Sequence, residues 1–203
     1  MIAVLTGDII NSAGYNTSEW LPKLKEYFLT LGNTPQDWEI YRGDEFQLRI
    51  VPEKAMEVAI YIKALIKTTK NLDVRIGIGL GEEDFKGSGV SESNGTAYQR
   101  SGRTLSFLKE KKINLAIATG DLQLDDTLNL ILKLGLDFMD AWSVVSAEII
   151  VMALKNPKTS QTEFANQLKI QQSAVSQRQK RARLDLVKDL LNYYHKNYKN
   201  PQS

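Results

Sequence analysis

The sequence predicts an α+β fold, with a sheet domain at residues 1–122 followed by an all-α module at residues 123–203. Strand-like patterns alternate with helical periodicities as far as about Asp121, and beyond that point only helical periodicities remain. The chain has 203 residues, 42% of them hydrophobic, which is enough for one domain of about 120–150 residues and a smaller second one.

The sheet domain begins with an apolar run at residues 2–5, which we interpret as a buried strand that ends before the following Thr-Gly-Asp. Apolar residues at helical intervals predict a helix over residues 19–31. Alternating apolar residues over residues 38–50, interrupted at Gly43-Asp44, predict a β-hairpin.

The rest of this domain continues the alternation of helices and strands. Residues 53–69 and 96–111 have helical spacing, and residues 74–81 and 113–119 have strand patterns. The order β-α-ββ-α-β-α-β is that of ferredoxin-like and nucleotidyl-cyclase-like palm sheets, in which we expect the helices on one face.

The strand at residues 74–81 has one nearly bare face, because Gly77, Gly79 and Gly81 alternate with apolar residues. Alternating glycines indicate that a ligand or another backbone comes close. A ligand in contact with Gly77 and Gly79 is one interpretation, and a closely packed helix is the other.

The C-terminal module reads as helices at residues 126–136, 140–154, 161–168 and 172–182, followed by a last amphipathic helix. The two short helices predict a helix-turn-helix at about residues 161–183, with the helix at 140–154 as its first helix. Its compact core is expected to contain Phe164, Ala165, Leu168, Ile170 and Val175.

Composition limits the chemistry. There is no cysteine and a single histidine, His195, so a metal site would use oxygen ligands and hold Mg²⁺ or Mn²⁺. No signal peptide or membrane span is evident, and we expect a cytoplasmic protein. From residue 151 onward the net charge is +7 and residues 1–150 carry −5, which favours an anionic partner for the tail.

Two acidic motifs, "TGDIINS" and "YRGDEFQ", are expected to meet in the sheet. Neighbouring strands would bring Asp8 beside Asp44, and a divalent cation would relieve their repulsion. The backbone amides of Ile9, Ile10, Asn11 and Ser12 would then cradle phosphate oxygens. The alternative is that both aspartates only stabilise turns.

The stretches "GDIINS", "GDEFQ", "GIGLGE" and "NGTAYQRSGR", with the C-terminal helix-turn-helix, resemble the SatD family over nearly the whole chain. The same residues are similar to a reduced class III nucleotidyl cyclase or GGDEF core. That resemblance implies two Mg²⁺ or Mn²⁺ ions at Asp8 and Asp44. It also implies Gln99 at the ribose-orienting position and Arg103 at the position that stabilises the transition state.

Three residues depart from the cyclase pattern: Ile40 stands where a base-selecting Lys is expected, Arg42 replaces a glycine, and Gln99 replaces an Asn. The resemblance therefore implies nucleotide or metal binding more strongly than it implies turnover.

The second helix of the predicted helix-turn-helix carries side chains suited to DNA. Gln and Arg can read base edges, and Lys, Arg and Ser can hold phosphates. The candidate contact residues are Gln172, Ser173, Ser176, Gln177, Arg178, Lys180 and Arg181. The alternative for this region is a helical bundle used for dimerisation.

Together these observations predict a ligand-responsive, DNA-binding regulator that binds a nucleotide with Mg²⁺ and double-stranded DNA, and acts as a homodimer. The rival interpretation is an active nucleotidyl cyclase or nucleotide hydrolase with a structural helical tail. A third is a scaffold that has kept only the fold.

Overall fold

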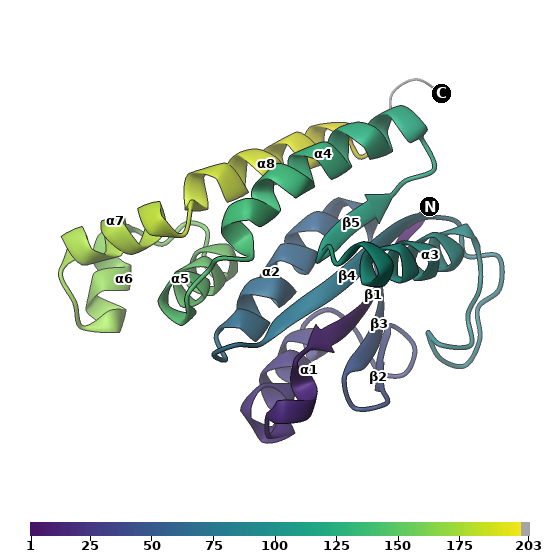
Figure 1. The fold of residues 1–203 in the computed structure, drawn as a ribbon, viewed down its shortest axis with the longest axis horizontal. Helices are drawn as coiled ribbons and strands as arrows, with labels where there is room; N and C mark the ends of the chain where they lie inside the picture. Colours follow the sequence, from purple (N-terminus) through teal and green to yellow (C-terminus); the bar gives the residue numbers. More distant parts are fainter. Residues whose placement is uncertain (200–203) are drawn as a thin grey trace.

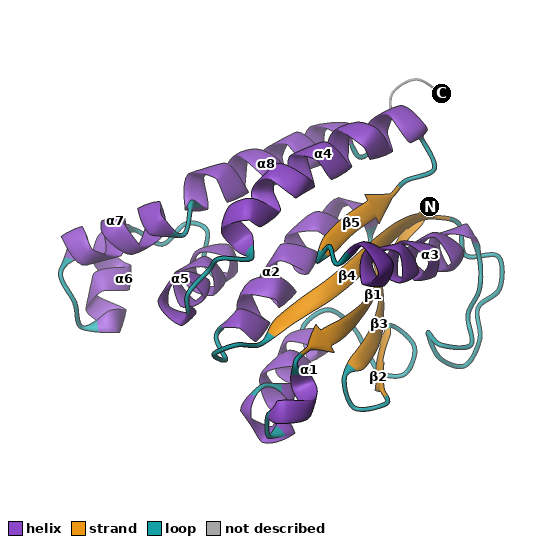
Figure 2. Cartoon of the chain, in the orientation of Figure 1, coloured by secondary structure: helices purple, strands orange, loops and turns teal. Residues whose placement is uncertain are grey.

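The computed structural model describes residues 1–199 and contains one five-stranded mixed sheet with helices packed around it (Figures 1 and 2). The strands are β1 (Ile2–Ile10), β2 (Trp38–Tyr41), β3 (Glu45–Ile50), β4 (Asp73–Gly81) and β5 (Leu115–Ala118). Their order across the sheet is β2-β3-β1-β4-β5. Only β4 and β5 are parallel, and the other neighbours are antiparallel. The predicted α+β class is confirmed.

The two faces of the sheet differ because side chains alternate along each strand. In β1, Ala3, Leu5 and Ile9 enter the main hydrophobic core, whereas Val4 packs in a separate small cluster with Ala97 on the opposite side. Both faces of β1, the middle strand of the sheet, are therefore covered.

Helices cover both faces, which corrects the expectation that they lie on one. The main core contains residues of α1 (Leu21–Leu29) and α2 (Ala55–Lys67), while α3 (Thr96–Lys111) packs on the opposite face against β4 and β1. The small cluster, which includes Val90 from the loop before α3, belongs to that second face.

The C-terminal part consists of α4 (Leu122–Met139), α5 (Val144–Lys155), α6 (Gln161–Leu168), α7 (Gln172–Arg181) and α8 (Leu184–Asn197). It shares one continuous core with the sheet, since α5 packs on α2 and α4 packs on β5. The hydroxyl of Tyr194 donates to the backbone oxygen of Pro52 at 2.6 Å, which joins α8 to the segment before α2.

A buried lysine also joins the two parts. The Lys63 ammonium, 1% exposed, lies 2.7 Å from Asp73 at the start of β4 and 2.6 Å from Asp140 at the end of α4. A buried charge is stable only when it is paired, so this network fixes α4 against the sheet.

Three predicted elements had bounds that were wrong by more than two residues. The first strand continues to Ile10 because Gly7 lets the Phe46 ring pack directly on the backbone, and alternation continues through Asp8. α4 begins at Leu122 because the Asp121 carboxylate caps it, accepting from Leu124 N at 3.0 Å. α5 begins at Val144, since Ser143 caps it. The bounds predicted for residues 96–111 and 161–168 are confirmed.

Within residues 1–199, no helix combines the length and apolar character that a membrane crossing requires.

Candidate functional site

The acidic edge of the sheet, which we define as Asp8, Asp44 and Glu45, forms where β1 meets the β2–β3 hairpin. Asp8 pairs in register with Glu45 of β3 on one side and Arg75 of β4 on the other. The amide of Ile9 donates to the backbone oxygen of Asp44 at 3.0 Å. The structure therefore brings Asp8 and Asp44, 36 positions apart in the sequence, to one edge, as the sequence indicated.

Asp8 already has a cationic partner. A guanidinium nitrogen of Arg75 lies 3.1 Å from one carboxylate oxygen of Asp8, and each side chain is 17% exposed. Burial raises the pKa of the Asp8 carboxyl above its usual range; Lys109 and Arg75 act against the rise, and Glu45 and Asp44 add to it. The Lys109 ammonium itself lies 3.1 Å from Glu45.

Asp44 is held by a hydroxyl. Ser12 donates to its carboxylate at 2.7 Å. Asn11 places Ser12 there, because Asn11 adopts a left-handed backbone (φ 67°) and its side-chain amide donates to the Asn71 carbonyl oxygen at 3.1 Å. The segment after β1 therefore locks the hairpin turn to the strand.

Two of the amides expected to cradle a phosphate are part of the sheet. The Ile9 amide is occupied by Asp44, and Ile10 pairs with Asp73 of β4. No helix follows directly, since only a short 3-10 turn at Ser12–Gly14 comes after Asn11. Ile9 and Ile10, which were expected to form part of a phosphate-binding turn, therefore belong to strand β1.

The bare glycine face is covered by α3. A Cβ on Gly77 would lie 2.6 Å from the backbone nitrogen of Leu105 and 2.6 Å from the backbone oxygen of Ser101. A Cβ on Gly79 would meet the backbone of Ala97 in the same way. Of the two interpretations, the closely packed helix is the one that the structure shows.

Gln99 and Arg103 lie away from the acidic edge. Both are exposed, while Ala97, Ser101 and Leu105 of the same helix are buried against the sheet. The hydroxyl of Ser101 makes the contact on the inner side, 2.9 Å from that of Thr6 in β1. Within one chain, the structure does not bring Gln99 or Arg103 to Asp8 and Asp44.

The acidic edge does not fit a preformed pair of cations. Residues 1–199 contain no group of three or more acidic or histidine side chains able to hold a metal ion. Arg75 and Ser12 already occupy the Asp8 and Asp44 carboxylates. The positive charge that a metal would supply therefore comes, in part, from Arg75.

Arg75, Glu45 and Lys109 were not among the predicted site residues. Arg75 is the one non-glycine residue among positions 75, 77, 79 and 81 of β4, and that contrast was a usable signal. Lys109 gave no local signal, because its contact with Glu45 spans 64 positions.

Helix α7 presents a different kind of surface. Six of its seven candidate residues are exposed, Arg178 is half-buried, and Val175 is fully buried below them. The six are Gln172, Ser173, Ser176, Gln177, Lys180 and Arg181. Phe164 and Ala165 of α6 are buried as predicted, and Leu168 and Ile170 pack against the core.

Hydrogen bonds between three glutamine side chains order the start of α7. Gln172 donates to Gln161 of α6, and Gln161 donates to Gln179 at 2.7 Å. Lys169, in a left-handed conformation (φ 54°), closes α6, and Ser160 and Glu163 form a capping box at its start. α6 and α7 are thus joined by a tight, ordered turn.

The fold and these regions define an α+β protein. Its five-stranded mixed sheet has an acidic edge whose charges are paired within the chain, and its C-terminal helices expose a polar, basic surface. The chain belongs to the SatD family, whose family model matches residues 1–192. That match includes the whole sheet and α1 to α7. No curated protein matches the chain.

Proposed function

We propose that this chain is a DNA-binding regulator in which α6 and α7 form a helix-turn-helix and α7 is the recognition helix. The observation that carries the proposal is the exposed outer face of α7, which holds glutamine, serine, lysine and arginine side chains above a single buried valine. In helix-turn-helix proteins the second helix enters the major groove, and such side chains read base edges and hold phosphates.

Charge supports the same proposal. α7 ends with Arg178, Lys180 and Arg181. None of these three side chains forms an ion pair within the described part of the chain. Unpaired cations on one surface attract the phosphate backbone and supply affinity that does not depend on sequence.

The two exposed glutamines of α7 differ in their side-chain hydrogen bonds. The Gln172 side-chain amide donates to Gln161, whereas the side chain of Gln177 has no hydrogen-bond partner among residues 1–199. A free side-chain amide can bind the N6 and N7 atoms of adenine in two hydrogen bonds. Gln177 is therefore the proposed base reader, and Arg178 and Arg181 are the proposed phosphate contacts.

The regulator would respond to a nucleotide bound with Mg²⁺ at the acidic edge. Support comes from the meeting of Asp8 and Asp44 and from the order β2-β3-β1-β4, which is that of a ferredoxin-like or cyclase-like palm. Because Arg75 holds Asp8, a cation would have to displace it. Mg²⁺ with ATP or GTP should therefore raise the melting temperature of Arg75→Gln more than that of the wild type.

The rival function, a nucleotidyl cyclase or nucleotide hydrolase, would need Gln99 and Arg103 to act from outside the chain that carries Asp8. We expect little or no cyclic or hydrolysed product from ATP or GTP with Mn²⁺. Robust turnover that is lost in Arg103→Ala would establish the enzyme instead.

The test of DNA binding is a titration of the full chain with mixed-sequence duplex DNA at two salt concentrations. Arg181→Ala should weaken binding and lower the salt slope by about 0.9. Arg103→Ala, which removes an exposed helical arginine of α3, is the matched control and should change neither. Absence of binding by the wild type at low salt, or equal effects of the two variants, would overturn the proposal.

A further inference from the structure

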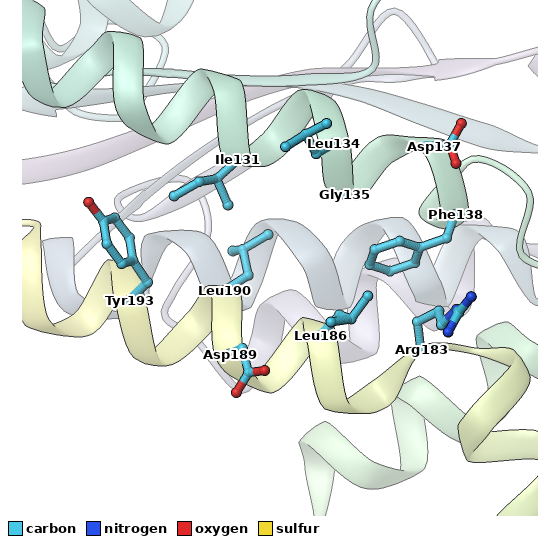
Figure 3. A pocket seen from close by; sticks show the side chains of 10 residues that line it. All are labelled: Ile131, Leu134, Gly135, Asp137, Phe138, Arg183, Leu186, Asp189, Leu190 and Tyr193. Atoms are coloured by element: carbon cyan, nitrogen blue, oxygen red, sulfur yellow. The ribbon is translucent and has the colours of Figure 1, made fainter.

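An apolar groove of about 610 Å³ runs between α4 and α8 on the outer side of the helical part (Figure 3). Ile131, Leu134 and Phe138 line it from α4, and Leu186, Leu190 and Tyr193 line it from α8. The helices pack closely at Gly135, where an added Cβ would lie in ordinary van der Waals contact with Leu190 Cδ1, at 3.5 Å.

A ridge of leucines stands beside this groove. Leu130 and Leu134, one helical turn apart on α4, are 59% and 67% exposed. Leu122, at the start of the same helix, is 82% exposed. Contiguous exposed leucines are unfavourable in water, and a patch of this kind marks an interaction site.

The occupant can be deduced from the combination of ridge and groove on one helix pair. In a two-fold interface each copy presents the same patch, so the patch must complement itself. A ridge that lies next to a groove meets that condition, because each ridge can enter the groove of the other copy. A partner of another kind would need only the groove.

Charges around the groove complement each other in the same way. Lys133 of α4 directly precedes Leu134, and Asp137 and Asp189 lie on the two outer rims, pointing away from the groove (Figure 3). All three are exposed, and none has an ion-pair partner within residues 1–199. Lys133 of one copy can therefore meet a rim carboxylate of the other.

The α4–α8 face is large enough for a small dimer interface. α4 has 18 residues and α8 has 14. At 1.5 Å per residue, α4 is about 27 Å long, and two helices side by side are about 20 Å wide. The projected face is roughly 500 Å², the scale of one side of the smaller specific interfaces.

We propose that the α4–α8 face is the interface between two copies of this chain, with the Leu130–Leu134 ridge of each seated in the groove of the other. This dimer belongs to the proposed regulator, yet DNA binding by single chains would survive its failure. Arg183 lines the groove and lies two residues after the end of α7, so the dimer would also fix the separation of the two recognition helices.

The experiment is sedimentation equilibrium of the full chain over a range of concentrations. The wild type should approach twice 22.9 kDa, and Leu134→Glu should raise the dissociation constant at least about thirtyfold, as expected for a central contact. Leu29→Glu is the matched control, since Leu29 is 63% exposed on α1 and should leave the dimer intact.

A charge exchange tests the orientation. Lys133→Glu and Asp189→Lys should each weaken the dimer, and the double variant should recover part of the loss. A wild type that stays monomeric up to its solubility limit, or one that dissociates with Leu29→Glu and not with Leu134→Glu, would overturn the proposed interface and leave the groove to another partner. Leu134→Glu should still bind DNA at low salt, and Arg181→Ala should still dimerise, so the two proposals fail separately.

Discussion

The acidic edge of the sheet and the outer face of α7 both carry charged side chains, but only those of the sheet are paired within the chain. Asp8 is bound by Arg75, Asp44 by Ser12, and Glu45 by Lys109. On α7, Lys180 and Arg181 are exposed and unpaired within the described residues.

The rest of the sheet face follows the pattern of the acidic edge. Arg49 binds both carboxylate oxygens of Glu83, at 2.8 and 3.1 Å, and Tyr98 donates to the same carboxylate at 2.7 Å. These contacts tie the loop before α3 to β3. Bidentate pairs of this kind give geometric specificity and hold a surface in place.

The difference separates two uses of charge. A half-buried charge needs a partner, and the partner that the chain supplies competes with any ligand. An exposed charge keeps its water and is free to meet an external phosphate. We therefore expect substitutions at the sheet edge to change the stability of the fold, and substitutions on α7 to change binding alone.

The largest effect should come from the glycine face below α3. Gly77→Ala places a Cβ against the backbone of Leu105 and Ser101, which cannot move as a side-chain tip can. We expect a loss of roughly 3 kcal/mol or more in the free energy of unfolding, at or above the upper end of overpacking effects. Denaturant unfolding followed by circular dichroism measures it.

Gly102→Ala is the matched control, because an added Cβ there meets nothing within 4 Å and Gly102 lies within α3. Helix propensity should make that variant about 0.5–1 kcal/mol more stable. If Gly77→Ala were tolerated equally well, α3 would not be held on the sheet, and the glycine face would be open to a ligand after all.

The second effect compares two arginines directly. Arg75→Gln leaves the Asp8 carboxylate, 17% exposed, without its partner, and we expect a loss of roughly 1–3 kcal/mol in stability. Arg181→Gln should stay within about 0.5 kcal/mol of the wild type, as exposed substitutions usually do. Urea unfolding of both proteins checks this pair, and equal losses would contradict the distinction between the two regions.

The third effect is on DNA binding alone, with no change in stability. Gln177→Ala should reduce discrimination between duplex sequences by roughly 1–3 kcal/mol if Gln177 reads an adenine edge. Arg181→Ala should instead weaken binding to all sequences alike. Competition binding against a randomised duplex pool distinguishes the two effects. An unchanged sequence preference in Gln177→Ala would show that Gln177 does not read a base edge.

Much of this comparison was accessible from the sequence, because local patterns fix local structure. Helical spacing located residues 161–168 and 96–111, and strand alternation located the hairpin. The meeting of Asp8 and Asp44 followed from the order of the strands, since it needed only β1 beside β3.

What the sequence could not predict were contacts between distant residues and their competition. The end of the first strand was misplaced because Gly7 looks like a turn residue until Phe46 packs on it. The glycines of β4 fit a ligand or a helix equally well as a pattern, and only the tertiary position of α3 decides. The α4–α8 groove leaves no motif, because each helix alone is an ordinary amphipathic one.

The smallest effect concerns the balance of forces at Asp8. Burial raises its pKa in the folded chain, with the charges of Glu45 and Asp44 acting in the same direction, while Lys109 and Arg75 oppose them. A folded state with a raised carboxyl pKa binds the proton more tightly than the unfolded chain does. The contribution of Asp8 to the stability of the wild type should therefore fall as the pH rises from the unfolded-state pKa of about 3.9 through the folded value, and should be constant above it.

Asp8→Asn removes this titration and keeps an oxygen that can accept from Arg75. The unfolding free energy of the variant minus that of the wild type should therefore become more positive between about pH 3 and pH 7. Urea titrations at several pH values measure the difference. A change in the opposite direction would mean that attraction to Arg75 and Lys109 outweighs burial. The ion pair would then be a net source of stability, and any cation offered to Asp8 would face a stronger competitor than the structure indicates.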